Sequence, residues 1–340
     1  MSNAALRLAA LNPGGRDPDQ DFPNFAGAPN EKIHAPVNYH GYAAATGGAF
    51  LRSVEAVRQR EIRSVILLLR SDLKASLVAL KQLQEHGCRV FISFKESGLH
   101  QVSQTLSKKG NPELFTQLCG FADGTISSTE DLVALYGGAG AKNLHFIPTP
   151  YPLGDSGWDF SIPPQERSGI FVGTREFDVP TRNHAMALAA AFALGREFSE
   201  TVSVVNEDGR SGRKQIDSFA ALTPGVKLNI IEGRRSYPEY LRNIARHRLV
   251  FQCDASAVPG QVAGDALLCG IPCVGGNGAV ERLAFHEFTS HGRSLTEVVE
   301  VARRLLGDAR FHEEATARAQ KQAYDKVSFH AVREQLAALL

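Results

Sequence analysis

The sequence predicts an α/β protein of two doubly wound domains, and three features of its 340 residues indicate this. Short apolar runs alternate with helical patterns along the chain, which is typical of parallel strands joined by helices. Proline and glycine crowd into residues 148–164, where they oppose regular structure and indicate a linker. The length suits two domains better than one. We therefore expect a first domain over residues 1–152, a second over 153–325, and a C-terminal helix over 326–340.

The first half contains five apolar runs with the length and composition of buried strands. These predict strands at Leu6–Leu11, Ser64–Leu69, Arg89–Phe94, Gly124–Ser127 and Leu144–Pro148. Helical patterns between them predict helices at Ala49–Glu61, Leu73–His86, Asn111–Gly120 and Glu130–Tyr136.

The same alternation restarts after the linker. Strands are predicted at Gly169–Val172, Thr201–Val205, Lys227–Glu232, Leu249–Cys253 and Pro272–Gly275. Helices are predicted at His184–Leu194, Tyr237–Arg246, Gln261–Cys269, Leu295–Gly307, Phe311–Tyr324 and His330–Leu340. Two such Rossmann-like units in succession predict a central cleft, and doubly wound sheets bind ligands beyond the carboxyl ends of their strands.

Composition excludes several functional classes. Hydrophobic residues make up 43% and charged residues 21%, and the net charge of +1 would not draw the whole chain onto nucleic acid or an anionic membrane. No apolar stretch approaches the ~20 residues of a membrane span, and the start lacks the pattern of a signal peptide. Five scattered cysteines indicate a reducing compartment. We expect a cytoplasmic protein of bacterial or phage type, and the sequence leaves its oligomeric state open.

One polar segment, Asn12–Gly48, is too long for an ordinary connection and is rich in Gly, Pro, Asp and Asn. Structureless loops of this length are usually functional or disordered. His40 lies in an apolar setting within it, so we expect an ordered loop over the cleft. The alternative for His40 is a partly buried histidine that only anchors the loop.

The strongest local pattern is residues 249–276, LVFQCDASAVPGQVAGDALLCGIPCVGG. Here a strand leads through a Pro-Gly turn at Gly260 into a helix that begins near Gln261. A glycine lets the backbone approach a ligand, and the first helical turn offers N–H groups to an anion. Asp265 lies about one turn further, within reach of a ribose hydroxyl. The alternative is a plain strand–loop–helix connection.

This segment resembles the nucleotide-sugar signature of GT-B glycosyltransferases, above all the glycogen-synthase-like family 4. There a glycine turn precedes a helix close to Glu-Ala-Met-Ala-Cys-Gly-Leu-Pro-Val-Val, where this chain has residues 265–274, DALLCGIPCV. Residues 169–175, GIFVGTR, and 231–234, IEGR, resemble further landmarks in the family's order, and 121–150 resembles a passage of its first domain. The match covers roughly residues 120–325.

The resemblance implies that Asp265 contacts the ribose and that the turn at Gly260, Gln261 and Val262 meets the diphosphate. It also implies phosphate-binding cations, and Arg175 and Arg182 fit them best. The glutamate that contacts the transferred sugar in the family corresponds to Ala257 here, and an alanine side chain cannot hydrogen-bond a sugar.

Other positions complete the predicted donor site. The landmarks add Gly173, Gly233, Arg234 and Tyr237, and we assign Gly14 and Gly15 of the long loop to the same ligand.

Catalysis is expected to depend on four side chains of the first half, which are His40, Lys95, Glu96 and Asp17. Lys95 and Glu96 stand where the family often ends its third strand with a histidine. An inverting enzyme needs a base, for which His40 and the Asp17 loop are candidates. A retaining enzyme needs none, and His40 would then position the sugar. Fixed cations can stabilise the leaving diphosphate, so we expect neither a metal nor a cofactor.

Two groups of charged residues carry less weight. Arg210, Arg213 and Lys214 are expected in a basic hairpin-like loop. Glu281 and the histidines after it are expected at the surface.

The sequence therefore predicts a nucleotide-sugar-dependent glycosyltransferase. Its acceptor stays open among a glycan, a lipid-linked sugar, a small molecule and a modified nucleobase. A nucleic-acid partner is less favoured, because aromatic residues do not interleave with the basic ones. The alternatives are a GT-B-like nucleotide-sugar epimerase and a nucleotide-binding protein whose catalytic site has decayed.

Overall fold

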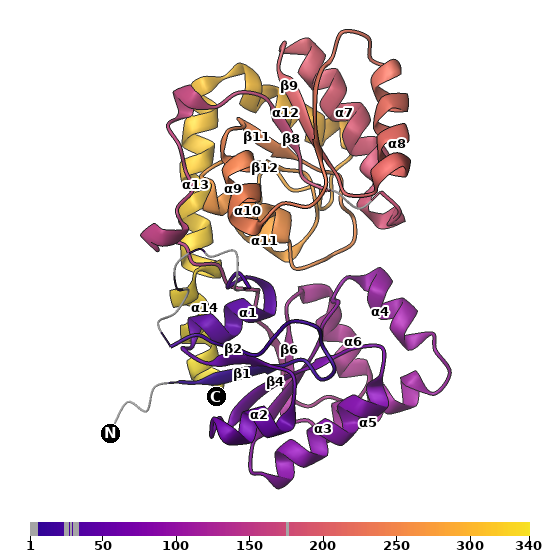
Figure 1. The fold of residues 1–340 in the computed structure, drawn as a ribbon, viewed down its shortest axis with the longest axis vertical. Helices are drawn as coiled ribbons and strands as arrows, with labels where there is room; N and C mark the ends of the chain where they lie inside the picture. Colours follow the sequence, from indigo (N-terminus) through magenta and orange to yellow (C-terminus); the bar gives the residue numbers. More distant parts are fainter. Residues whose placement is uncertain (1–5, 24–26, 28, 30–33, 175–176) are drawn as a thin grey trace. The chain divides into compact units, whose positions relative to one another are not determined.

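The computed structural model describes residues 6–23, 27, 29, 34–174 and 177–340. The chain divides into two compact units (Figure 1). Unit 1 comprises Met1–Gly157 and Lys326–Leu340, and unit 2 comprises Trp158–Asp325. Unit 1 thus includes the C-terminal helix, which we expected to stand apart.

The described part of unit 1 holds a seven-stranded sheet in the order β2-β3-β1-β4-β5-β6-β7. The strands are β1 Leu8–Leu11, β2 Gln20–Asp21, β3 Ala49–Leu51, β4 Ser64–Leu69, β5 Arg89–Phe94, β6 Gly124–Ser127 and β7 Leu144–Phe146. All neighbours pair in parallel except β2 with β3. The chain passes from β1 to β3 on one side and then to β4 on the other, so the carboxyl end of β1 is a switch point, where such sheets bind ligands.

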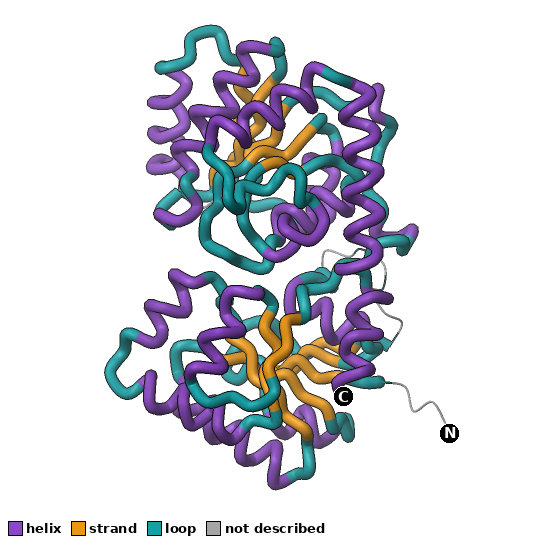
Figure 2. The backbone as a smooth tube through the Cα atoms, turned by 180° about the vertical axis from the view of Figure 1, so that it is seen from behind, coloured by secondary structure: helices purple, strands orange, loops and turns teal. Residues whose placement is uncertain are grey.

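Helices cover both faces of this sheet (Figure 2). The helices are α1 Asn38–Ala45, α2 Val54–Gln59, α3 Leu73–Glu85, α4 Leu99–Leu106, α5 Asn111–Phe121, α6 Val133–Gly138 and α14 Phe329–Leu339. One core joins α2, α3 and α5 to alternate residues of the strands, among them Leu67 and Ile92. On the other face α1 packs against β1 and β3, and α14 packs against α1.

Unit 2 holds a five-stranded parallel sheet in the order β10-β9-β8-β11-β12. The strands are β8 Ile170–Val172, β9 Thr201–Asn206, β10 Lys227–Glu232, β11 Leu249–Phe251 and β12 Cys273–Val274. The chain leaves β8 toward β9 and β10 and then returns to place β11 on the other side of β8. The loops after β8 and β11 therefore meet at the switch point.

The helices of unit 2 complete a doubly wound domain. They are α7 His184–Glu197, α8 Gly209–Ala221, α9 Tyr237–Ala245, α10 Gln261–Leu268, α11 Ala279–Ala284, α12 Leu295–Gly307 and α13 Ala309–Val327. Most predicted strands and helices lie within two or three residues of these bounds, and the α/β fold class is confirmed.

Two predictions of local structure in unit 1 are wrong. Residues 49–61 do not form one helix, because Ala49–Leu51 pairs with β1 as β3 and Ser53 then caps α2 through the Ala56 N–H. The segment after Asn12 is not a plain loop either, since it contains β2 and α1.

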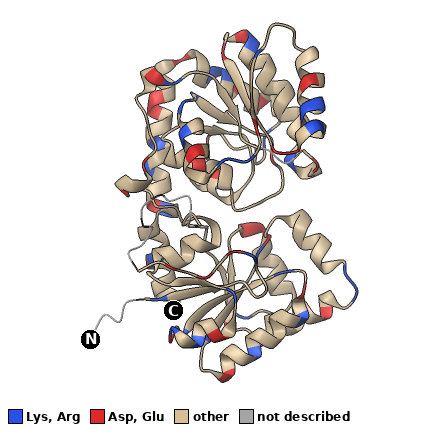
Figure 3. Ribbon diagram, in the orientation of Figure 1, with Lys and Arg blue, Asp and Glu red and all other residues tan. Residues whose placement is uncertain are grey.

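Charged residues of both signs are interspersed along the helices of each unit (Figure 3). Among the described residues, no helix combines the length and the apolar character needed to cross a membrane.

Candidate functional site

The switch point of unit 2 is built around Gly260. This residue precedes α10 with a φ of +93°, a conformation that favours glycine. No side-chain hydrogen bond caps the helix there, and the positive end of a helix dipole favours an anion.

Gly173 brings the loop after β8 against the same turn. A Cβ at Gly173 would lie 2.4 Å from Val262 Cγ1, so only glycine lets β8 end this close to α10. The Gly173 N–H donates to Phe251 O over 2.9 Å and joins the ends of β8 and β11. The structure thus brings the predicted residues Gly173, Gly260 and Val262 together. Arg175, predicted to bind phosphate, lies outside the described residues.

Asp265 is buried inside α10, with 1% of its surface exposed. The Tyr237 hydroxyl donates to Asp265 Oδ1 over 2.5 Å. Tyr237 begins α9, and a capping box between Ser236 and Glu239 fixes this helix start. The Tyr237 ring also lies 6.3 Å from the ring of Trp158. The structure therefore unites two predicted donor residues, with the phenol orienting the carboxylate.

Arg182 ends a short 3₁₀ helix, η4 (Pro180–Arg182), at the loop after β11. Its Nη1 donates to Asp254 Oδ2 in an ion pair that leaves the Asp254 side chain 4% exposed. The Ala255 N–H also donates to Thr181 O over 2.8 Å and ties η4 to this loop. Arg182 was predicted from the sequence, but its partner Asp254 was not. A phosphate bound by Arg182 would share the guanidinium with the Asp254 carboxylate.

Glu281 is the residue of this region that sequence reasoning missed. We expected it at the surface, but it is 2% exposed, on α11. Its Oε1 accepts a hydrogen bond of 2.8 Å from Gln252 Nε2, while Oε2 has no partner among the described residues. Burial is the main cause that raises the pKa of Glu281 to about 7. Three glycines, Gly260, Gly276 and Gly278, surround the carboxyl group in the folded chain, and the local sequence around Glu281 gives no sign of this burial.

Gly233 and Arg234 lie after the edge strand β10. Gly233 has a φ of +73° and donates to Asn206 O over 2.9 Å, and Arg234 is exposed. The structure gives neither a contact with the Gly260 turn among the described residues.

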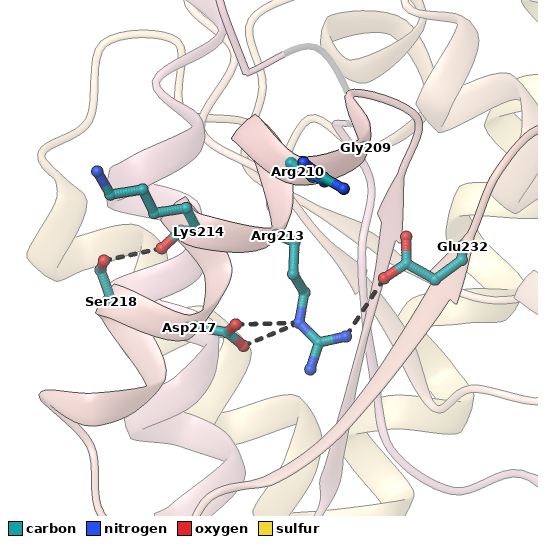
Figure 4. A pocket seen from close by; sticks show the side chains of 7 residues that line it. All are labelled: Gly209, Arg210, Arg213, Lys214, Asp217, Ser218 and Glu232. Atoms are coloured by element: carbon teal, nitrogen blue, oxygen red, sulfur yellow. Dashed lines mark hydrogen bonds and ion pairs between the residues drawn. The ribbon is translucent and has the colours of Figure 1, made fainter.

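The basic loop expected at Arg210, Arg213 and Lys214 is instead the start of helix α8. Figure 4 shows the Arg213 guanidinium between Asp217 and Glu232, with N···O distances of 3.0 and 3.4 Å. All three side chains are about half exposed, so these ion pairs contribute little to the stability of the folded protein. These residues line a pocket on this face, and none of the predicted donor residues is among its lining residues.

In unit 1, the switch point carries a buried polar group that sequence reasoning also missed. Asn12 follows β1, is 1% exposed, and has no hydrogen-bond partner for Nδ2 or Oδ1 among the described residues. The predicted glycines form its turn: Gly14 has a φ of +67°, and a Cβ at Gly15 would lie 2.3 Å from Asn12 Nδ2.

His40 lies on α1, 3% exposed, with its ring stacked between two others. The ring centroids of Phe50 and His34 are each 3.7 Å from that of His40. Burial, then the charges of His34 and Lys95, lowers the pKa of His40 to about 2. A general base works best with a pKa near the operating pH. This pKa argues against His40 as a general base. A neutral ring suits the other predicted role, the positioning of the sugar, better.

Asp17, His34 and His40 offer ligand atoms that all lie within 4.8 Å of one another. His34 Nδ1 lies 3.0 Å from Ala35 O, so the other ring nitrogen can face the cluster. The two rings are parallel within 6°. The lone pairs of stacked parallel imidazoles do not converge on one point, so a ring would have to tilt before both could bind one ion.

Lys95 and Glu96 follow β5 at the same edge of the sheet. Lys95 Nζ lies 3.6 Å from Glu96 Oε1 and 6.0 Å from the centre of the Tyr39 ring. The Tyr39 hydroxyl donates to Phe94 O and lies 3.0 Å from Ser93 Oγ. Lys95 thus lies over the ring of Tyr39, which hydrogen bonds hold in place and which precedes His40 on α1. The Glu96 side chain, by contrast, is 72% exposed.

No protein-family model and no curated protein matches the sequence. Solved structures do. Anabaena HepE, in complex with UDP and glucose, superposes with a TM-score of 0.65 at 14% identity over 98% of this chain and 99% of that one. A UDP-forming trehalose-phosphate synthase from Burkholderia xenovorans gives 0.60 at 10% identity over 98% of each chain. A protein of Listeria monocytogenes described as a UDP-N-acetylglucosamine 2-epimerase gives 0.51 at 13% identity, over 84% and 76%. The chain therefore has the GT-B fold, as predicted.

Proposed function

We propose that this protein is a glycosyltransferase that moves a sugar from a nucleotide-sugar donor to an acceptor. The observation that carries the proposal is the switch point of unit 2. There helix α10 begins, the hydrogen bond between Tyr237 and Asp265 links α9 to α10, and Arg182 joins the loop after β8 to the loop after β11. A helix start and a guanidinium suit a diphosphate, and an oriented carboxylate suits ribose hydroxyls. The likeness in fold to HepE with bound UDP supports this assignment.

The chemistry of transfer explains why such groups are needed. Negative charge develops on the β-phosphate as the glycosidic bond breaks, and preorganised donors stabilise it without reorganisation. We assign this role to the start of α10, to Arg182 and to Arg175. These cations and dipoles belong to the protein, so we propose that transfer needs neither a metal ion nor a cofactor.

Unit 1 would then bind the acceptor at the carboxyl end of its sheet. Asn12, His40 and Lys95 offer polar groups there, and two of them are buried without partners for these groups among the described residues. Hydroxyl-rich ligands suit such groups. We keep a glycan, a lipid-linked sugar, a small molecule and a modified nucleobase as candidate acceptors, and we place the protein in the cytoplasm.

A thermal-shift screen against UDP, GDP, ADP, CMP and TDP tests the donor site. We expect at least one nucleotide to raise the melting temperature, since a ligand of the native state stabilises it. Asp265→Ala should weaken the binding of that nucleotide at least tenfold. Asp217→Ala, which removes an exposed carboxylate on α8, is the matched control and should leave the affinity unchanged. Failure of all five nucleotides would refute the proposal.

The second candidate is a nucleotide-sugar epimerase, which the fold likeness to the Listeria protein favours. An epimerase needs no acceptor, so an isomer of the donor sugar would appear when the enzyme and donor are incubated alone. A decayed binding protein, suggested by Ala257, would bind nucleotide but turn over no donor with any acceptor.

A further inference from the structure

The carboxyl group of Glu281 fills a space formed by three glycines. A Cβ at Gly260 would lie 2.1 Å from Glu281 Oε2, and one at Gly278 would lie 2.4 Å from the same atom. A Cβ at Gly276 would lie 3.0 Å from Oε1. Side chains at Gly260 and Gly278 would collide with the carboxyl group, which therefore lies directly against the backbone of the turn that starts α10.

The charge of this group matters because water does not reach it. Oε1 is held by the Gln252 amide, but Oε2 has no hydrogen-bond donor among the described residues. A buried carboxylate without a full set of donors costs far more free energy than the neutral acid in the same place. The carboxyl group is thus poised to hold or release a proton according to the charge nearby.

Among the residues that the structure describes, the charged and titratable groups that face Glu281 are Asp254, Arg182 and Cys273. Asp254 disfavours the Glu281 carboxylate and Arg182 favours it, while Arg182 is itself paired with Asp254. Burial keeps the pKa of the Cys273 thiol well above its usual range, so this thiol stays neutral. An anion bound at Gly260 and Arg182 would pair with the Arg182 guanidinium. It would also add negative charge beside Glu281, which disfavours the Glu281 carboxylate.

We propose that Glu281 is a positioning residue of the donor site and that it takes up a proton when a nucleoside diphosphate binds at the Gly260 turn. The inference rests on the proposed function, because it assumes that the diphosphate binds there. The proton moves from solvent to the Glu281 carboxylate, and no other bond changes. The neutral carboxyl group then supports the turn without repelling the phosphates.

Isothermal titration calorimetry with UDP tests this. Titrations at pH 8 in HEPES and in Tris, whose ionisation enthalpies differ, count the protons exchanged. The terminal phosphate group of UDP has a pKa near 6 and stays ionised above pH 7. We expect the wild type to take up at least half a proton, and its dissociation constant to rise up to about tenfold per pH unit between pH 7.5 and 8.5. Glu281→Gln should take up almost no proton, and its dissociation constant for UDP should change less than twofold between pH 7.5 and 8.5.

The exposed carboxylate of Asp217 provides the control. Asp217→Asn should keep the proton uptake of the wild type. Binding of UDP by the wild type without proton uptake overturns the inference and leaves the proposed donor site intact, even if Glu281→Gln fails to fold. Equal uptake by the wild type and Glu281→Gln assigns the proton to another group and also overturns it. No binding of UDP or of the other four nucleotides refutes the proposed function and the inference with it.

Discussion

Replacing Glu281 with glutamine should change how the stability of unit 2 depends on pH. The wild-type carboxyl group is 2% exposed, and burial raises its pKa from 4.5 to about 7. The folded state therefore holds this proton more tightly than the unfolded chain. Its contribution to stability is fully present below pH 4.5 and is lost as the pH rises through about 7. Glutamine has nearly the same shape and does not titrate.

The magnitude follows from the shift in pKa. One unit corresponds to about 1.36 kcal/mol, and linkage over the interval from pH 5 to pH 8 gives a loss of about 2.5 kcal/mol. The free energy of unfolding of the wild type should fall by this amount relative to Glu281→Gln. A constant offset between the proteins would report how well the amide packs, while the change of that offset with pH reports the carboxyl group.

Urea denaturation followed by tryptophan fluorescence measures this difference. Trp158 is the one tryptophan of the chain, is 2% exposed, and belongs to unit 2, so its emission reports the unfolding of the relevant unit. Curves at pH 5, 6.5 and 8 give the free energy for both proteins. If the two lose stability in parallel, the carboxyl group titrates near its ordinary value and the account of its burial is wrong.

Four further predictions concern single side chains. Tyr237→Phe removes the hydrogen bond that orients Asp265 and should weaken nucleotide binding roughly five- to tenfold in calorimetry, a loss of about 1 kcal/mol; unchanged affinity would contradict the orienting role. Gly260→Ala should abolish measurable nucleotide binding, because the methyl group meets the Glu281 carboxyl group and the φ of +93° strains alanine. The ring of His40 should stay neutral down to pH 4 in NMR titrations, since its pKa is lowered to about 2; protonation near pH 6 would refute its burial. Leu336→Ala on α14 should cost unit 1 about 2–5 kcal/mol in denaturant unfolding, as the side chain is fully buried.

Long apolar runs and strong helical periods were predictable from the sequence. The bounds of β4, β5, β10 and α12 match the prediction because each has an uninterrupted pattern. The helix after Gly260 was predictable for a similar reason, since α10 at Gln261–Leu268 lies within one residue of the predicted bounds, while its use as a donor site stays a prediction.

Other elements carried misleading local patterns. Helix α1 is buried on nearly all sides, so it has no amphipathic stripe. Helix α8 begins with Gly209 and includes Gly212, which favours a loop in isolation. The structure explains Gly212, because a Cβ there would lie 2.2 Å from Asn206 Oδ1.

The environment of Glu281 could not be predicted, because it is formed by residues that meet only in the folded chain. Gly260 is distant in sequence, and Gln252 comes from the end of another strand. The same holds for Asn12, whose lack of partners depends on the turn that folds over it.

The path of the backbone through unit 1 has a consequence for how this protein is made. The backbone of Tyr151 pairs with residues 327–329, and α14 packs against α1, the helix that carries His40. All of unit 2 is encoded between these partners. A ribosome adding about 5–20 residues per second needs roughly 10 to 30 s to cross that stretch. Unit 1 therefore cannot complete its packing until α14 has been translated, and the apolar surface around α1 stays uncovered until then. We expect the nascent chain to depend on chaperones during this interval, and unit 2 to be complete first.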